Sequence, residues 1–193
     1  MAKMSMLTLN TLPRKFYQEN TVKVAKNLLG KRIVRKIGRQ QVSGIITETE
    51  AYRHKDDPAS HAFRKITERN KAMFGDAGIA YVYFTYGMYY CFNVVARHPS
   101  AAAGAVLIRA IEPEKGIKIM QKNRENKDMK NLTNGPAKLT QALNITKKHY
   151  GIDLTKDPKL FITDGIKPKK IFASPRIGIR EAVDKQWNFK IKI

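Results

Sequence analysis

Alternating hydrophobic and polar positions predict two strands early in the chain. Residues 31–37 and 41–47 are both rich in β-branched side chains, and the glycine-containing stretch 38–40 separates them. This pattern is typical of two antiparallel strands joined by a turn. The second strand runs directly into residues 48–52, Glu-Thr-Glu-Ala-Tyr, which carry the first candidate functional side chains.

A second antiparallel pair is predicted in residues 81–96. This stretch, YVYFTYGMYYCFNVVA, contains two aromatic and β-branched runs interrupted by Gly87-Met88. Such runs on either side of a glycine indicate a β-hairpin, with Tyr86 and Tyr89 flanking its tip. The apolar stretch 105–111 predicts a further strand.

Helical character is found in three stretches, which are 22–29, 113–126 and 137–143. Thr21 is the expected N-cap of the first helix and Gly30 is its stop. Pro136 suits the first position of the third helix, where a missing backbone N–H costs nothing.

The rest of the chain predicts irregular structure. Residues 53–76 are polar and predict a long ordered loop with a helical turn at 69–74, and loops with short strands follow from Asp153 onward. Strands and helices are mixed without regular alternation, and no internal repeat appears. We therefore expect one domain over residues 1–193, of the α+β class, with a mainly antiparallel sheet, surrounding helices and a protruding β-hairpin.

The charge of the chain is its most unusual bulk property. Lys and Arg number 37 against 16 Asp and Glu, which gives a net charge of +21 spread from Lys3 to Lys192. A folded body this basic favours a polyanionic partner, and nucleic acid binds such surfaces through counterion release. Charge alone also fits a surface adapted for solubility, or an organism whose proteins are generally basic.

Other classes of protein receive little support. Met1–Leu9 has no leader-like apolar run, and no stretch approaches the ~20 apolar residues of a membrane span, so we expect a cytosolic protein without a membrane partner. Cys91 is the only cysteine, and the four histidines are scattered, so we expect no metal. No nucleotide-binding fingerprint surrounds Gly30-Lys31, and no cofactor is expected.

Glu48, Glu50 and Arg109 are the first candidates for chemistry. In an extended chain both carboxylates and Tyr52 project to one side, and such a pair suits acid/base or glycosidic reactions. Spacing alone favours the simpler interpretation, a solvated strand end. Arg109 is the only charge in its apolar strand, so it calls for an anionic partner, which could be these carboxylates or an ordinary buried ion pair.

The tyrosines of the hairpin are the second set of candidates. They are Tyr81, Tyr83, Tyr86, Tyr89 and Tyr90. Aromatic residues at this density usually pack within a sheet. In a nucleic-acid-binding protein, however, an exposed ring at the tip can wedge between base steps while others stack on a base. His61 by itself fits a hydrogen-bonded loop histidine, and Cys91 a small buried apolar residue.

Seven motifs occur in one fixed order: LLGKRIVR at 28–35, ETEAY at 48–52, DPASH at 57–61, TERNKAMF at 67–74, YVYFTYGMYYCFN at 81–93, LIRAIEP at 107–113 and GPAKL at 135–139. From about residue 15 to the Pro-Arg-Ile-Gly stretch at 175–178, this series resembles the alkyladenine (3-methyladenine) DNA glycosylase family. Glu68 departs from the family, which often has proline there, and the last third matches poorly in detail.

The resemblance implies a role for each matching residue. Glu50 corresponds to the general base and Arg109 to the residue that helps hold the nucleophilic water, with a backbone carbonyl near 177–179 completing the site. The base pocket is expected from Tyr52, His61, Tyr83 and Asn93, where Asn93 would exclude the amino group of normal guanine. Tyr86 would be the DNA wedge with Met88 beside it, and Arg69 and Lys138 would contact DNA.

The implied activity is that of a monofunctional DNA glycosylase. It would flip alkylated or deaminated purines out of double-stranded DNA and hydrolyse the N-glycosidic bond with a water activated by Glu50, leaving an abasic site. The implied protein is a monomer with no obligate protein partner and no cofactor, associated with the nucleoid. The alternatives are a non-catalytic nucleic-acid-binding module and a hydrolase of free nucleosides.

Overall fold

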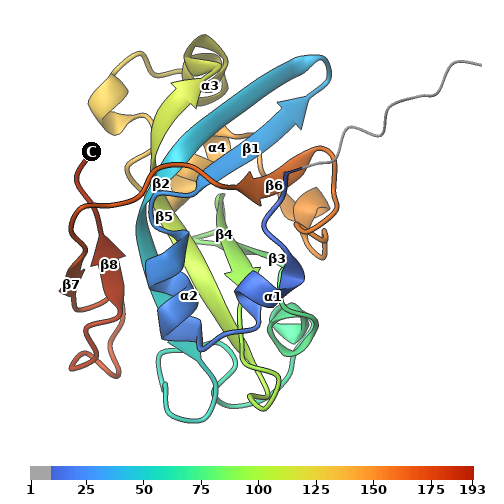
Figure 1. Ribbon diagram of the computed structural model, residues 1–193, viewed down its shortest axis with the longest axis vertical. Coiled ribbons are helices and arrows are strands. Elements are labelled where there is room, and N and C mark those ends of the chain that lie inside the picture. Colours follow the sequence, from blue (N-terminus) through green and yellow to red (C-terminus); the bar gives the residue numbers. More distant parts are fainter. Residues whose placement is uncertain (1–9) are drawn as a thin grey trace, which may run out of the picture.

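The computed structural model describes residues 10–193, in which one antiparallel sheet dominates (Figure 1). Six strands lie side by side in the order β3-β4-β5-β2-β1-β6, and β8 joins β2 and pairs with β7. The strands are β1 (Arg32–Ile37), β2 (Gln40–Arg53), β3 (Ala80–Thr85), β4 (Tyr89–Val95), β5 (Gly104–Lys115), β6 (Leu160–Thr163), β7 (Phe172–Ser174) and β8 (Asn188–Lys190). The helices are α1 (Arg14–Tyr17), α2 (Thr21–Leu28), α3 (Ile117–Arg124) and α4 (Pro136–Ala142). This arrangement confirms the predicted α+β class.

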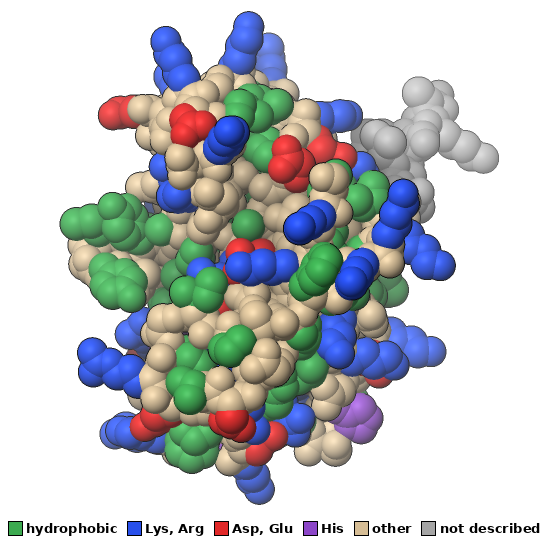
Figure 2. Space-filling model, turned by 90° about the vertical axis from the view of Figure 1, so that its left-hand side faces the viewer, with side chains coloured by type: hydrophobic (Ala, Val, Ile, Leu, Met, Phe, Trp, Pro, Cys, Tyr) green, Lys and Arg blue, Asp and Glu red, His purple; other side chains and the backbone are tan. Residues whose placement is uncertain are grey.

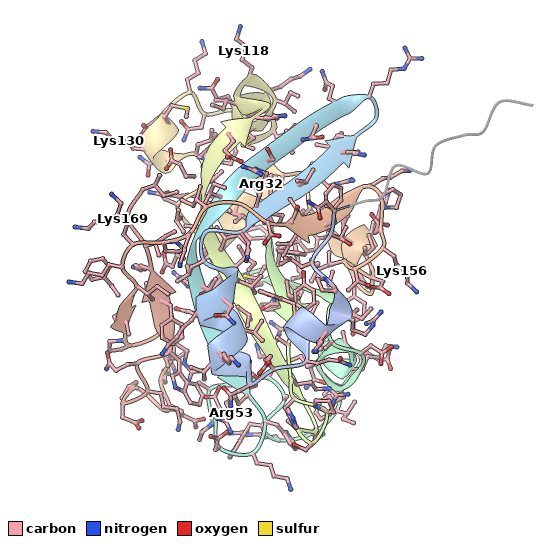
Figure 3. All side chains as sticks on the ribbon, viewed as in Figure 1. Arg32, Arg53, Lys118, Lys130, Lys156 and Lys169 are labelled. Carbon is pink, nitrogen blue, oxygen red and sulfur yellow. The ribbon has the colours of Figure 1, made fainter. Side chains whose placement is uncertain are left out.

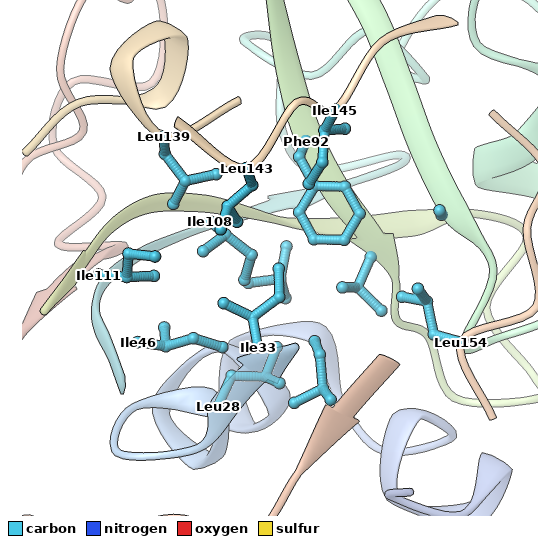
Figure 4. Close-up of a cluster of buried hydrophobic side chains, with 14 of the residues drawn as sticks. Leu28, Ile33, Ile46, Phe92, Ile108, Ile111, Leu139, Leu143, Ile145 and Leu154 are labelled. Atoms are coloured by element: carbon cyan, nitrogen blue, oxygen red, sulfur yellow. The ribbon is translucent and has the colours of Figure 1, made fainter. Parts of the chain in front are cut away.

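The hydrophobic core joins the sheet to its helices. Helix α2 packs on β2 and β5, and α4 packs on β4 and β5. Buried side chains from these elements and from β1 meet in Figure 4, including Leu28, Ile33, Ile46, Phe92, Ile108 and Leu139. Their removal from water supplies the main force that holds the sheet in place, at ~25 cal/mol per Å² of apolar surface. The core therefore gives the functional side chains a rigid base.

Strand β2 is the strand on which the candidate site is built. It pairs with β5 along one edge, and its far end pairs with β8 along the other. Thr49 faces the core, where its hydroxyl donates to the Ala25 carbonyl oxygen of α2 at 2.8 Å. Because successive side chains of a strand point to opposite faces, Glu48 and Glu50 lie on the side away from α2.

The pairing of β2 with β5 is irregular at the site. The register shifts on both sides of Glu48, and Arg109 has no residue directly opposite it, since Ala110 pairs with Glu48 and Ile108 with Thr49. Such bulges bend a strand and re-aim its side chains. Here the irregularity brings the Arg109 guanidinium toward the two carboxylates of β2.

The structure corrects two predicted helix boundaries. Asn20, not Thr21, caps α2, because the Asn20 side chain accepts a hydrogen bond from the Val22 backbone N–H at 3.0 Å. The Thr21 hydroxyl instead donates to the buried Ala96 carbonyl oxygen at 2.8 Å. The helix predicted at 113–126 begins only at Ile117, because β5 continues along β2 to Lys115 and Gly116 then takes a left-handed conformation with φ of 71°.

Other local predictions agree with the structure. Pro136 lies in the first turn of α4, and a 3-10 helix at Lys71–Phe74 falls within the predicted helical turn. Strands β3 and β4 pair antiparallel with Thr85 opposite Tyr89. The prediction for Met1–Leu9 lies outside the described residues. Between residues 10 and 193, no helix has both the length and the hydrophobicity needed to cross a bilayer.

Candidate active site

A cavity of about 490 Å³ opens on the face of the sheet away from α2. Its walls come from β2, β3, β4 and β5, from the loop between β2 and β3, and from residues 177–181 before β8. Segments more than a hundred residues apart in sequence therefore share one surface. Figure 2 shows a face of the molecule on which hydrophobic side chains gather between projecting Lys and Arg side chains.

The strand period explains which side chains reach this cavity. Tyr81 and Tyr83 of β3 line it, and they pair with Asn93 and Cys91 of β4. The residues between them face the opposite way into the core. Burial raises the pKa of the Cys91 thiol and the pKa of the Tyr83 phenol, so both groups stay neutral. As predicted, Cys91 is a small buried side chain.

Glu50 lies at the bottom of the site with its carboxylate surrounded by hydrogen-bond donors. It is fully buried and sits behind the cavity surface. Its Oε1 accepts from the Ile177 backbone N–H at 2.8 Å and from the Asn188 side-chain amide at 2.9 Å. Its Oε2 accepts from the Tyr52 hydroxyl at 2.8 Å. Glu50 is therefore a buried carboxyl group whose two oxygens both accept hydrogen bonds, and not a solvated strand end.

Arg109 joins the two carboxylates of β2. Its Nε donates to Glu48 Oε1 at 2.9 Å, and its terminal nitrogen lies 3.5 Å from Glu50 Oε1. The Asn188 amide also bridges the pair, with Glu48 Oε1 at 2.8 Å, and Lys190 lies 3.3 Å from the same oxygen. Two cations thus balance two anions. Since Arg109 and Tyr52 also line the cavity, the ion pair contacts the place where a ligand would lie.

Tyr52 and His61 present neutral polar groups to the cavity. Burial, the nearby Glu50 carboxylate and the hydrogen bond to it raise the pKa of Tyr52, so its phenol remains a donor. His61 Nδ1 lies 2.8 Å from the Tyr81 hydroxyl, and its ring packs edge-on against Tyr83 at 4.7 Å between centroids. Burial within this cluster, and the Arg69 charge, lower the pKa of His61 to about 4. The imidazole is therefore uncharged at neutral pH.

Arg69 lies in the wall of the cavity, whereas the resemblance implied only that it contacts DNA. Its guanidinium stacks 4.8 Å from the centre of the Tyr83 ring and forms part of the cavity wall. Lys138 donates to the side-chain oxygens of Asn131 and Asn134 at 3.0 Å and 2.8 Å, beside the rim residue Pro136. Neither placement tests contact with DNA.

Tyr86 and Met88 lie in the turn between β3 and β4. Their side chains are 85% and 63% exposed, and Tyr86 also reaches the cavity rim. Tyr86 has a positive φ of 52°, which is rare for a residue with a side chain. The turn thus presents an aromatic and an apolar side chain to solvent next to the cavity.

Two further features concern possible metal ligands and Glu68. Within residues 10–193, no group of three or more His, Cys, Asp or Glu side chains is arranged to hold a metal ion. Glu68, which departs from the resembled family, is exposed and pairs with Lys71 at 2.7 Å beside the 3-10 helix. It does not line the cavity that contains Tyr83 and His61.

Comparison with known proteins assigns this geometry to a family. Residues 15–193 match the family described as methylpurine-DNA glycosylase. The chain belongs to this family. It is therefore a DNA-repair hydrolase that acts on N-glycosyl bonds, and the resemblance drawn from the seven motifs is confirmed.

Relatives of this glycosylase match it over nearly their whole length. A protein of Carboxydothermus hydrogenoformans is 49% identical over 183 residues, which are 94% of this chain and 95% of that protein. A protein of Alkaliphilus oremlandii is 44% identical over 193 residues, with 94% and 95% covered, and one of Francisella tularensis is 47% identical over 176 residues, with 89% and 90% covered. All three are provisionally named 3-methyladenine DNA glycosylases.

The sequence missed two residues that hold the site of this glycosylase together. Asn188 bridges Glu48 and Glu50, and Arg176 lies fully buried beneath Tyr52. Asn188 carries no local signal, because it is one polar residue in a short C-terminal strand. Arg176 lies in the recognised Pro-Arg-Ile-Gly stretch, but nothing in the pattern showed that it is buried. From the same stretch a carbonyl was expected at the water site, whereas the observed contact to Glu50 is the Ile177 N–H.

Proposed function

We propose that this protein is a monofunctional glycosylase that releases alkylated or deaminated purines from double-stranded DNA and leaves an abasic site. Glu50 is its general base, acting on a water molecule at the sugar. The observation that carries the proposal is the Glu50 carboxylate, which is buried among charged and neutral donors directly behind a cavity lined with tyrosines. A carboxylate there can deprotonate water and also stabilise the positive charge that develops on the sugar.

The hydrogen bonds of Glu50 support a particular place for the water. Oε1 contacts the Ile177 N–H, the Asn188 amide and Arg109, whereas among the described residues Oε2 accepts only from the Tyr52 hydroxyl. A carboxylate oxygen can accept more than one hydrogen bond. The remaining capacity lies on Oε2, next to Tyr52, which forms the cavity wall. We infer that the water binds there, with Arg109 holding the carboxylate in place.

The cavity suits a flipped purine. Tyr52, Tyr83 and His61 supply ring surfaces and neutral hydrogen-bonding groups, and electron-poor alkylated bases bind well against aromatic faces. Asn93 is nearly fully buried, and its amide donates to the Tyr81 carbonyl oxygen at 3.0 Å, so its position is fixed. We propose that this rigid side chain excludes the amino group of normal guanine.

The exposed turn suits the role of wedge. Tyr86 would fill the gap left in the duplex with Met88 beside it, as apolar side chains do when they enter a base step. Arg69 and Lys138 would contact the DNA around the cavity. One chain carries both the cavity and the turn, so we propose that it acts as a monomer, on chromosomal DNA in the cytoplasm, without an obligate protein partner.

A Glu50→Gln substitution tests the mechanism. The amide keeps the size of the side chain but cannot accept a proton, so base release from methylated duplex DNA should fall by on the order of 10²-fold or more. Lesion binding should persist, since the cavity walls remain. Single-turnover release of free methylpurine and the Kd for the same duplex are the two measurements.

Glu114→Gln is the matched control, because Glu114 lies farther along β5 and pairs with Arg32, away from the cavity. It should release purine at the wild-type rate. Near-normal release by Glu50→Gln would remove Glu50 from the mechanism. If even the wild-type protein released no purine from alkylated duplex DNA, a non-catalytic nucleic-acid-binding module would be the better description.

A further inference from the structure

A buried ion pair lies beneath the floor of the cavity, outside the catalytic groups described above. Both Arg176 and Asp57 have side chains that are 0% exposed. The two terminal nitrogens of Arg176 donate to the two carboxylate oxygens of Asp57, each at 2.6 Å, in a fork-to-fork arrangement. Asp57 begins the DPASH motif, and its Oδ2 also accepts from the Arg53 backbone N–H at 3.0 Å.

Arg176 connects three separate walls of the site. One terminal nitrogen also donates to the Ala51 carbonyl oxygen of β2 at 2.9 Å. The guanidinium stacks between the rings of Tyr52 and Trp187, at 4.7 Å and 5.3 Å from their centres. The loop that carries Asp57 leads to the cavity wall at His61. The next residue after Arg176 is Ile177, whose N–H donates to Glu50.

Stability is a poor explanation for this arrangement. Removing two charges from water costs about as much as their attraction returns, and apolar replacements of buried ion pairs are often no less stable. Among the described residues, the Arg176 Nε is also buried without a hydrogen-bond partner, which adds a further cost. The pair instead fixes orientation. A guanidinium that makes two hydrogen bonds to one carboxylate restrains both the Asp57 side chain and the backbone at Arg176.

We propose that Arg176, locked by Asp57, is a positioning residue that holds the Ile177 amide on Glu50 and the Tyr52 ring against the cavity. This inference rests on the proposed role of Glu50. Arg176 acts through Tyr52 and Ile177 and does not line the cavity itself. Its loss should slow base release more than it weakens lesion binding, because a misplaced carboxylate costs rate even where the pocket still accepts the base.

The test is a double substitution that leaves no unpaired buried charge. In Asp57→Asn/Arg176→Met, the asparagine oxygen still accepts from the Arg53 N–H, and methionine fills the space. We expect a thermal midpoint close to that of the wild type, a Kd for methylated duplex DNA changed by less than about threefold, and single-turnover methylpurine release slowed on the order of 10- to 100-fold. Release at the wild-type rate would overturn the proposal.

Asp56→Asn/Arg53→Met is the matched control. Arg53 also lies on the Trp187 ring, at 5.6 Å, and pairs with Asp56 at 3.2 Å, but this pair is partly exposed and outside the cavity wall. It should release purine normally. If Asp57→Asn/Arg176→Met fails to fold, Arg176→Lys replaces it, since lysine keeps the charge without the fork, and wild-type release by Arg176→Lys would overturn the proposal.

A second measurement does not depend on catalysis. Hydrogen exchange of the backbone amides in residues 174–181 should be at least about tenfold faster in the double variant, because the segment loses its anchor, while exchange in β4 stays unchanged. Unchanged exchange in 174–181 would overturn the inference. Wild-type protein that releases no methylpurine would overturn the proposed function instead, and the exchange measurement would still decide whether Arg176 holds this segment.

Discussion

At the scale of single residues, the lowered pKa of His61 keeps this cavity residue uncharged at neutral pH. The ring packs against Tyr83, and its Nδ1 contacts the Tyr81 hydroxyl. Burial is the larger cause of its lowered pKa, and the positive charge of Arg69 is the second. A neutral imidazole adds no repulsion toward a cationic alkylated base. A substitution of Arg69 can therefore change the pKa of His61 without altering the histidine itself.

Arg69→Gln should raise the pKa of His61 from about 4 part of the way toward its ordinary 6.5, because one of the two causes is removed. The measurement is an NMR titration of the imidazole resonances. Arg64→Gln, in the same loop, removes a charge that is not among the causes of the shift and should leave the titration unchanged. An unaltered His61 titration in Arg69→Gln would mean that burial alone sets the shift.

The same shift makes stability depend on pH. The pKa of His61 is lower in the folded state than in the unfolded chain, so between pH 6.5 and about 4 the unfolded chain binds the extra proton. Stability should therefore fall as the pH falls through this window. His61→Gln should reduce that slope in urea unfolding experiments. A slope identical to that of the wild type would contradict the lowered pKa of His61.

At the scale of elements, the turn between β3 and β4 combines strain with exposure. Tyr86 and Gly87 both have positive φ values, of 52° and 68°. Turns of this type favour Asn-Gly, because asparagine tolerates the left-handed region better than other residues with side chains. A tyrosine there costs stability, of order 1 kcal/mol, and exposes its ring. Strain of this kind is often kept for function.

Tyr86→Asn should therefore stabilise the protein while weakening its function. We expect the free energy of unfolding to rise by about 0.5–1 kcal/mol, from urea melts, because the strain is relieved. The Kd for lesion-containing duplex should rise, because no ring fills the gap in the base stack. Tyr86→Phe keeps the ring and should bind as the wild type does. Equal affinity of Tyr86→Asn for damaged DNA would exclude the wedge role.

Elements also show the limits of local patterns. The strands were predictable because burial on one face imposes a period of two, and the alternation of Tyr81 and Tyr83 with core residues follows from it. The extension of β5 to Lys115 was not predictable in this way, because residues 113–126 have helical character, while in the structure the long strand β2 pairs with residues 113–115. A neighbouring strand, which lies far away in the sequence, decided the local conformation.

At the scale of the whole molecule, positive charge is distributed around the surface. The labelled basic residues in Figure 3 lie on several sides of the outline, with Lys118 on α3, Lys130 and Lys169 on one side and Lys156 on the other. The net charge of +21 therefore favours approach to DNA from many directions. When DNA is bound at the cavity, only some of these basic side chains would contact its phosphates.

Turnover on duplex DNA should fall steeply with salt. If the protein neutralises 6–10 phosphates, kcat/KM on methylated duplex should drop by roughly 10³ to 10⁵ between 50 and 200 mM salt. Lys138→Gln should reduce the slope by about one unit if Lys138 contacts a phosphate. Lys23→Gln should not, because Lys23 lies on α2, on the other side of β2 from the cavity. Salt-independent turnover would favour a hydrolase of free nucleosides.

The sequence by itself predicted the main strands, most of the helices and the candidate site residues, because periodicity and motifs act over a few neighbouring positions. The resemblance carried by these motifs singled out Glu50, Arg109, Tyr52, His61 and Tyr83 as candidates, and the structure brings all five to one cavity or directly behind it. Only the tertiary structure decided that Glu50 is fully buried, and that Ile177 and Asn188, which are 127 and 138 residues farther along the chain, donate to it. Such contacts depend on how the C-terminal segment packs beside β2, and no local pattern encodes that packing.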